Sequence, residues 1–201
     1  MSKGRVAFGC RVDGNSTFFS FPTSFVYESN LRNHIFHQSA LCHFVHAMEA
    51  VKRFFSSPRF AVAGASNDTN KFGYKILAWY HQHSLPVTPL NPRAAQISLP
   101  SRVYDTVPSP SALPSPTQTS LSVVTPPPVT LTLLQEAHSV GIPAVWLQPG
   151  TFDDRVVEYA RGHFEAVIAG DGGMGSEGWC VLVDGDDGLE AAGVQWTSQR
   201  L

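Results

Sequence analysis

Short apolar runs alternate regularly with segments of helical periodicity between residues 60 and 169, and this alternation is what most constrains the fold. Five runs have the length of buried strands: Phe60–Ala63, Pro86–Leu90, Leu121–Thr125, Ala144–Leu147 and Ala166–Ala169. They are apolar over most of their length, as strands are when helices cover both faces of a parallel sheet. The sequence therefore predicts an α/β fold, namely one Rossmann-like domain with a doubly wound, mostly parallel sheet and helices on both faces.

Helices are predicted between these runs. Apolar side chains recur at helical intervals in residues 48–55, 72–80 and 129–140. Thr151 is expected to cap a fourth helix that ends at Gly162.

The remaining segments are less regular. A very short strand is expected at Val103–Tyr104 and a last strand at Trp179–Val183. Residues 1–47 are rich in Ser, Phe and His, poor in acidic residues and without a sustained period. A poorly structured extension is the favoured interpretation, and a mitochondrial targeting segment is the alternative, because such segments are basic and acid-poor. The predicted organisation is an extension over 1–47, one domain over 48–184 and a loosely structured tail over 185–201.

Composition narrows the classes of function. The chain has 201 residues and a formal net charge of -2, so no overall basic field draws it to nucleic acid or to an anionic membrane. No apolar run reaches the roughly 20 residues that span a bilayer. The 3 cysteines are widely spaced, which favours free thiols in a reducing compartment. We therefore expect a cytoplasmic protein, with the mitochondrion as the alternative, whose partner is a small-molecule nucleotide ligand.

Small, polar and proline residues follow four of the predicted strands, at the edge where a parallel sheet binds its ligands. The candidate binding residues are Gly64, Ala65, Ser66, Lys71, Gly73, Asn91, Pro92, Arg93, Thr125, Pro126, Pro127, Gln148 and Gly150.

The turn Gly64-Ala65-Ser66 joins a strand to a helix that starts near Lys71. Free backbone N–H groups and the helix dipole favour an anion at such a junction, and small residues let a phosphate approach closely. An ordinary tight turn is the alternative. The chain contains no Gly-Lys-Ser/Thr of a Walker loop here.

Arg93 follows the second strand. In NAD sites an Asp or Glu usually stands at this position and forms hydrogen bonds with the ribose hydroxyls. An arginine suits a phosphorylated ribose instead, because its planar fork of donors matches phosphate. Both coenzyme A and NADP carry such a phosphate. An exposed turn arginine is the alternative.

The two remaining segments would border the same cleft. The prolines after Thr125 are expected to form a rigid apolar wall for an adenine ring or a pantetheine arm. Gln148 is expected to bond an amide, and Gly150 to leave space beside it. Simple helix initiation and a strand-to-helix turn are the alternatives.

Three other patterns are interpreted as structural. Residues 170–175 match GxGxxG, but they lead into a predicted strand and not into a helix, which favours a flexible loop. The histidines between His34 and His46, together with Cys42, fit no standard ligand spacing, so no metal site is predicted. Cys180 lies in an apolar run and is expected to be an inert core thiol.

Five motifs, taken in order, resemble those of the small single-domain CoA-binding proteins, relatives of the CoA-binding domain of the succinyl-CoA synthetase α subunit. They are Phe60–Ser66, Lys71–Gly73, Pro89–Pro92, Val123–Pro127 and Val145–Gly150. The resemblance covers about residues 48–183 and implies a Rossmann-like fold with CoA bound across the strand ends. The catalytic domain of the synthetase, with its phosphorylated histidine, has no counterpart in this sequence, so the resemblance implies binding and not ligase activity.

Three functions remain open. The leading hypothesis is non-catalytic binding of coenzyme A or an acyl-CoA, in a sensor, carrier or regulatory role. An NADP-dependent oxidoreductase is the runner-up, and it needs a general acid such as an aligned Tyr-Lys pair, whereas Tyr74 and Lys75 are adjacent and point to different helix faces. A ligand-free protein-interaction domain is the third. The sequence contains no catalytic constellation and names no protein partner.

Overall fold

The computed structural model describes residues 5–12, 15–22, 47–170, 172–174 and 176–201. The chain divides into two compact units, Met1–His46 and Ala47–Leu201. Each unit is described by itself.

A five-stranded sheet forms the centre of the second unit. Its strands are β3 (Arg59–Ala63), β4 (Val87–Leu90), β7 (Thr119–Val123), β8 (Ala144–Leu147) and β9 (Ala166–Ile168). All neighbours pair in parallel, in the order β4-β3-β7-β8-β9. The chain moves from β3 to one side and then returns to build the other, so the strand order reverses between β3 and β7. The predicted doubly wound α/β fold is confirmed.

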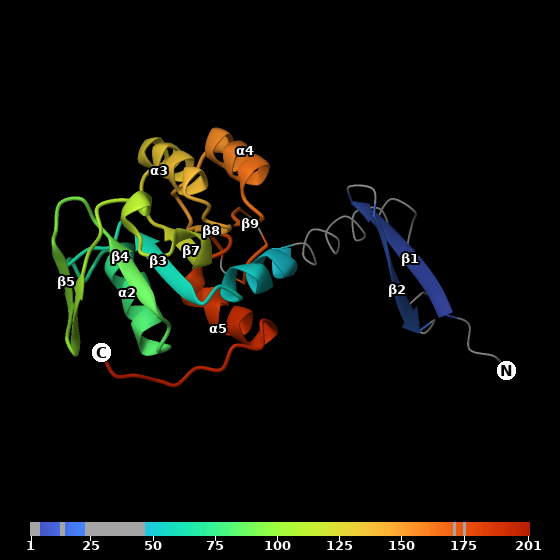
Figure 1. Cartoon of the computed structure of the whole chain (residues 1–201). Coiled ribbons are helices and arrows are strands. Elements are labelled where there is room, and N and C mark those ends of the chain that lie inside the picture. The colour runs from blue at the N-terminus through green and yellow to red at the C-terminus, as the bar shows by residue number, and fades with distance from the viewer. Residues whose placement is uncertain (1–4, 13–14, 23–46, 171, 175) are drawn as a thin grey trace. The chain divides into compact units, whose positions relative to one another are not determined.

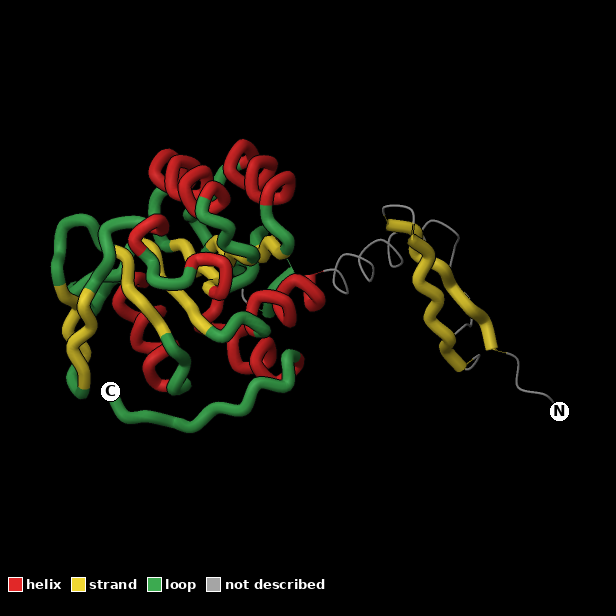
Figure 2. The backbone as a smooth tube through the Cα atoms, viewed as in Figure 1, coloured by secondary structure: helices red, strands yellow, loops and turns green. Residues whose placement is uncertain are grey.

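Helices cover both faces of this sheet. They are α2 (Phe72–Gln82), α3 (Pro127–Ser139), α4 (Asp154–His163) and α5 (Val181–Ala191), and a further helix is described over residues 47–55. Figure 1 shows α3 and α4 on one face and α2 and α5 on the other, and Figure 2 shows the strands in yellow between the red helices.

Two apolar cores result from this arrangement. Successive side chains of a strand point to opposite faces, and β3 accordingly contributes Phe60 and Val62 to one core and Ala61 and Ala63 to the other. The first core is strongly aromatic around Trp146. Both faces of the sheet are therefore covered by packed side chains. In a sheet of this kind a ligand binds at the carboxyl ends of the strands.

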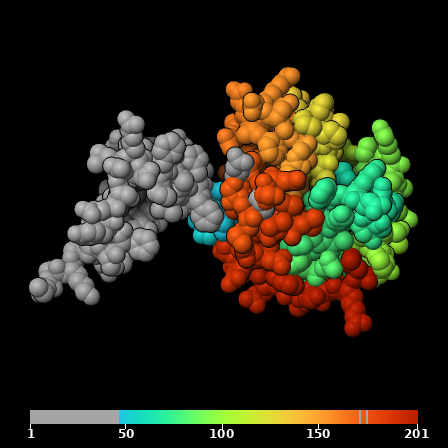
Figure 3. All heavy atoms as spheres, turned by 180° about the vertical axis from the view of Figure 1, so that it is seen from behind, coloured from blue at the N-terminus to red at the C-terminus, as the bar shows by residue number. Residues whose placement is uncertain are grey.

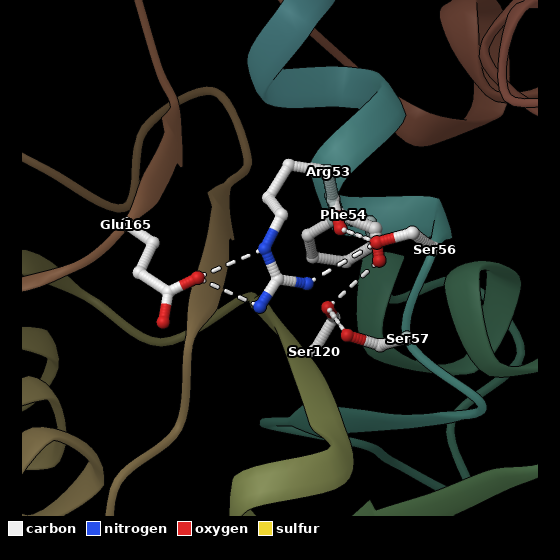
Figure 4. A network of polar contacts seen from close by, with 6 residues as sticks. All are labelled: Arg53, Phe54, Ser56, Ser57, Ser120 and Glu165. Carbon is white, nitrogen blue, oxygen red and sulfur yellow. Dashed lines mark hydrogen bonds and ion pairs between the residues drawn. The ribbon is translucent and has the colours of Figure 1, made fainter.

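The helix over residues 47–55 is tied to the amino-end side of the sheet (Figure 4). Arg53 donates from Nε and Nη2 to Oε2 of Glu165, at 2.9 and 2.7 Å. The Ser120 hydroxyl lies within hydrogen-bond distance of two acceptors, at 2.8 Å from the carbonyl oxygen of Phe54 and 2.8 Å from the Ser57 hydroxyl. These contacts are remote from the carboxyl ends of the strands.

A small hairpin follows β4. It consists of β5 (Gln96–Leu99) and β6 (Arg102–Asp105), which pair antiparallel in a sheet of their own. The predicted short strand at Val103–Tyr104 lies in β6, whereas β5 was not predicted. Asn67 attaches the hairpin to the loop after β3, because its Nδ2 donates to Gln96 O at 2.9 Å and its Oδ1 accepts from Ser98 N at 2.8 Å.

The predicted strand at Trp179–Val183 is wrong, because α5 begins at Val181 and continues through residues 185–191 of the expected tail. Glycines weaken helices, and Gly185 and Gly188 made this segment look irregular. Their role is close packing. A Cβ atom at Gly185 would lie 2.4 Å from the Trp79 ring, and one at Gly188 would lie 2.7 Å from the Phe55 ring.

The residues after α5 are bound to the far end of α2. Gln199 N donates to Gln82 O at 2.8 Å, and Ser84 Oγ donates to Thr197 O at 2.5 Å. Ser101 Oγ donates to Arg200 O at 3.0 Å. Residues 194–201 form no helix or strand, and hydrogen bonds hold residues 197–200 against the rest of the unit.

In the first unit the structure describes an antiparallel pair, β1 (Arg5–Val12) and β2 (Asn15–Pro22). These strands lie within the segment predicted to be poorly structured. Val6, Phe8 and Cys10 stand at alternate positions, which is the pattern of a strand, and the prediction did not take it into account. The histidines from His34 to His46 lie outside the described residues. Among the described helices, none combines the length and apolar character needed to cross a membrane.

Candidate functional site

Four loop segments meet at the carboxyl edge of the sheet. Ala63 pairs with Leu90 and with Val123, and Val123 pairs with Leu147, so the strands end in register. The segments that follow them include residues 64–66, 91–93, 125–127 and 148–150. These are the four segments singled out from the sequence, and the structure places them side by side.

The first turn packs directly on the start of α2. Gly64 has a φ of +89°, a conformation that residues with a side chain rarely adopt, and its N–H donates to Leu90 O at 3.2 Å. A Cβ atom at Gly73 would lie 2.0 Å from the carbonyl oxygen of Gly64. Glycine at both positions lets the helix begin against the strand end, which aims the helix N-terminus at this turn.

The N-terminus of α2 has the properties of an anion site. Its N-cap residue Lys71 makes no side-chain cap, and its first turn contains no acidic residue. Among the described residues, the amides of Phe72 and Gly73 find no acceptor, and the Lys71 ammonium joins no ion pair. Unsatisfied amides, the helix dipole and this cation all favour negative charge. The hydroxyl of Ser66 accepts from Asp68 N at 3.1 Å and keeps its own hydrogen to donate.

Asn91 has a structural role that the sequence did not indicate. Its Nδ2 donates to the carbonyl oxygen of Ala65 at 2.8 Å, and its Oδ1 accepts from Arg93 N at 2.8 Å and Ala94 N at 3.1 Å. The side chain thus fixes two of the loops to each other. Pro92 and Arg93 are exposed beside it, and within the described part of the chain the Arg93 guanidinium forms no ion pair.

A cavity of about 410 Å³ opens beyond the second pair of loops. Four of the predicted residues line it: Thr125, Pro126, Gln148 and Gly150. The others do not line it, namely Gly64, Ala65, Ser66, Lys71, Gly73, Asn91, Pro92, Arg93 and Pro127. The candidate residues therefore form two neighbouring regions, a cationic turn and a cavity, and Phe72 belongs to the start of α2 and to the cavity wall.

The sequence did not indicate the far wall of the cavity. It is built by Ser176, Glu177, Gly178, Cys180, Leu182 and Val183, from the start of α5 and the loop before it. Helix α5 packs beside α2 on the same face of the sheet, and Figure 3 shows the orange-red segment around α5 next to the teal segment that contains the start of α2. Since Trp179–Val183 was taken for a strand, these side chains were not expected at the strand ends.

Gln148 is the most distinctive polar group of the cavity. Its side chain is 2 % exposed, and its Oε1 accepts from Val181 N at 3.1 Å. Its Nε2 is buried without a hydrogen-bond partner among the described residues. A buried donor left unpaired costs about 1–3 kcal/mol, so this amide is suited to a ligand that brings an acceptor.

Thr151 does not cap α4, contrary to the prediction. Its hydroxyl donates to Gln148 O at 2.7 Å, and Asp153 caps the helix by accepting from Val156 N at 2.9 Å. On the other side of the cavity, Thr130 Oγ1 donates to Thr125 O at 2.8 Å, and Pro127 occupies the first turn of α3. Both walls are thus fixed by local hydrogen bonds.

The glycine-rich segment 170–175 leads into a helix, so the reason for discounting it was wrong. The carboxylate of Asp184 accepts from Met174 N at 2.6 Å and from Cys180 N at 2.8 Å, and Gln148 takes the amide of Val181. Within the first turn of α5, Gln148 therefore takes the amide of Val181, and Val183 N donates to Cys180 O at 2.9 Å. The carboxylate of Asp184 also places a negative charge at this helix end, which disfavours an anion. This helix end is therefore occupied by the protein's own side chains.

Cys180 is not a core thiol of a strand. It is the N-cap residue of α5, half-buried, and it lines the cavity. Burial raises the pKa of its thiol, and the negative charges of Asp184 and Glu177 raise it further, against lowering by backbone hydrogen bonds. Within the residues that the structure describes, no group of three His, Cys, Asp or Glu side chains is arranged to hold a metal ion.

Comparison with known proteins agrees with this geometry. A family model described as a CoA binding domain matches residues 58–178, which is more than half of the chain. No curated protein is similar enough to count as a match.

Solved structures share the fold. A conserved hypothetical protein from Pyrococcus furiosus is 25% identical, with a TM-score of 0.52 over 63% of this chain and 97% of that one. A Thermus thermophilus protein is 24% identical, with a TM-score of 0.53 over 61% of this chain and 90% of that one. A hypothetical protein from Pyrococcus horikoshii OT3 is 18% identical, with a TM-score of 0.54 over 61% and 83%.

Proposed function

Since this chain belongs to the family of CoA binding domains, we propose that it binds coenzyme A or an acyl-CoA across the carboxyl ends of β3, β7 and β8. The proposed role is non-catalytic, as a sensor, a carrier or a regulator of another protein. The observation that carries the proposal is the pairing of a cationic turn with a cavity that contains one buried, unpartnered amide donor among the described residues.

The two regions match the two halves of the ligand. The pyrophosphate lies at the Gly64–Ser66 turn, where the free amides of α2 and the Lys71 ammonium offset its charge. Arg93 reaches the ribose phosphate at the exposed side of the same turn. The pantetheine arm runs past Thr125 into the cavity, where Gln148 Nε2 donates to one of its carbonyl oxygens.

The phosphates are assigned to the turn and the pantetheine arm to the cavity because the two regions differ in polarity. Phosphates need cations and amides, which the turn offers, whereas the pantetheine arm is mostly apolar with two amides. The cavity is walled chiefly by apolar side chains such as Phe72, Val124 and Leu182. Pockets of this kind typically combine apolar walls with a few placed polar groups.

Thermal unfolding of the full-length protein with CoA, acetyl-CoA, NAD and NADP tests the proposal. A ligand at 100 times its Kd adds about 2.7 kcal/mol of stability. We expect CoA or acetyl-CoA to raise the Tm, and NAD and NADP to leave it unchanged. A rise with NADP alone would favour an oxidoreductase, and no rise with any of the four would favour a ligand-free interaction domain.

A further inference from the structure

The charge in the lining of the cavity beside α5 is negative, although CoA itself is an anion. Among the described residues that line it, Glu177 is the only charged one. The cations Lys71 and Arg93 belong to the turn outside its lining. The end of the cavity near α5 therefore offers a negative charge and no positive one.

The apolar part of the lining is exposed to an incoming ligand. Phe72 is 56 % exposed and Val183 is 51 % exposed, although both are large apolar residues. They come from the starts of α2 and α5 and face the same cavity. An aliphatic group placed between them would remove apolar surface from water on both sides.

The amide of Gln148, which lines the cavity, has a fixed orientation. Oε1 of Gln148 is engaged by the Val181 N–H, so Nε2 is the atom left without a partner among the described residues. Gln148 Nε2 is the donor proposed above for a carbonyl of the pantetheine arm, and this neutral amide does not offset the charge of Glu177.

We propose that this cavity is an acyl subsite that selects thioesters of uncharged aliphatic acids and rejects acyl groups with a terminal carboxylate. The inference rests on the proposed binding of CoA. A terminal carboxylate entering here loses its water, meets Glu177 and finds no cation among the lining residues, so its transfer is unfavourable. An aliphatic chain of the same length meets Phe72, Leu182 and Val183 instead.

Butyryl-CoA and succinyl-CoA form a matched pair for the test, because both carry four-carbon acyl groups and differ in the terminal carboxylate. Isothermal titration of the full-length protein with CoA, butyryl-CoA and succinyl-CoA, at one ionic strength, measures the three affinities. We expect butyryl-CoA to bind at least as tightly as CoA, and succinyl-CoA to bind at least about tenfold more weakly than butyryl-CoA.

A charge-removing variant tests the cause. Glu177→Gln should reduce the ratio of the butyryl-CoA affinity to the succinyl-CoA affinity, because it removes the repulsion of the terminal carboxylate without changing the size of the side chain. Glu158→Gln is the matched control, since Glu158 is exposed on α4 and does not line the cavity. It should change none of the affinities.

The outcomes separate this inference from the proposed function. Binding of CoA with equal affinities for the butyryl and succinyl thioesters overturns the inference alone. The same holds if Glu177→Gln leaves the ratio of the two affinities unchanged. Absence of binding by all three ligands contradicts the proposed function and removes the inference with it.

Discussion

Asn91 donates a hydrogen bond from Nδ2 to the carbonyl oxygen of Ala65 at 2.8 Å, so the loop after β4 holds the turn after β3. The same side chain accepts from the amides of Arg93 and Ala94. One asparagine thus orders two of the loops that border the proposed phosphate site, without presenting its oxygen to the ligand.

Asn91→Ala is expected to lower the free energy of unfolding by about 1–3 kcal/mol, because it leaves these backbone groups without their partners. Urea denaturation of variant and wild type measures the loss. Pro92→Ala is the control beside it, since Pro92 is exposed, and it should stay within about 1 kcal/mol. An Asn91→Ala protein as stable as the wild type would show that the loops are ordered by other contacts.

Gly73→Ala is expected to be strongly destabilising, by roughly 1–3 kcal/mol or more, because the new Cβ would lie 2.0 Å from the carbonyl oxygen of Gly64 and α2 would have to move. Gly162→Ala provides the contrast. Gly162 is also helical, in α4, and nothing lies within 4 Å of an added Cβ, so alanine should be neutral or stabilising by up to about 1 kcal/mol. Thermal unfolding of both variants compares them, and similar Tm values would contradict the packing argument.

Arg93→Ala should weaken CoA about fivefold if its guanidinium meets the ribose phosphate, the loss expected for one exposed charged contact of about 1 kcal/mol. Dephospho-CoA lacks that phosphate and should bind wild type and variant alike. Titration calorimetry with both ligands gives the four affinities. An equal loss of affinity for the two ligands would show that Arg93 contacts a part of CoA other than the ribose phosphate. No loss for either ligand would show that Arg93 does not contact CoA.

Cys180 should react slowly with iodoacetamide at neutral pH. Burial and the carboxylates of Asp184 and Glu177 raise the pKa of its thiol, so the thiolate fraction is small at neutral pH and should increase only at a pH above that at which an ordinary cysteine ionises. CoA should protect it, because the thiol lines the cavity. Peptide mass spectrometry distinguishes Cys180 from Cys10 and Cys42, and fast modification at about pH 7 in the presence of CoA would contradict both expectations.

Glu136 is expected to make a pH-dependent contribution to stability. Burial alone would raise the pKa of its carboxyl, but hydrogen bonds from Ser109 Oγ at 2.6 Å and from Ser111 N at 3.1 Å lower it below its usual value. A carboxyl whose pKa is lower in the folded than in the unfolded protein stabilises the fold at pH values above its unfolded-state pKa. This stabilisation is lost as the pH falls through the folded-state pKa. Glu136→Gln should therefore be less stable than wild type at about pH 7, and urea denaturation should show the difference shrinking below about pH 4.

Much of the sheet could be predicted because its strands are buried on both faces. Phe60–Ala63 and Ala144–Leu147 are continuously apolar, and turn residues mark where each ends. The loops that carry Gly64, Asn91, Thr125 and Gln148 follow from those ends by topology alone. The role of Asn91 could not be predicted, because it depends on which carbonyl the folded loop brings to its side chain.

The cavity could not be predicted from the sequence for a different reason. Its far wall depends on α5, and the sequence of α5 contradicts helix propensity at Gly185 and Gly188. Those glycines are required by contacts with Trp79 and Phe55, which are distant in the sequence. Tertiary packing here outweighs local propensity, so only the folded chain shows that Cys180 and Glu177 lie at the strand ends.

Helix α2 is attached at both of its ends. Its first turn rests on the carbonyl of Gly64, and its last turn and the residues just after it are hydrogen-bonded to residues 197–200. The fold itself therefore holds the N-terminal amides of α2 in place, and the proposed phosphate site does not require this helix to move when an anion binds. A preorganised site of this kind forfeits little conformational entropy on association, so tight binding there would not depend on a large contact area.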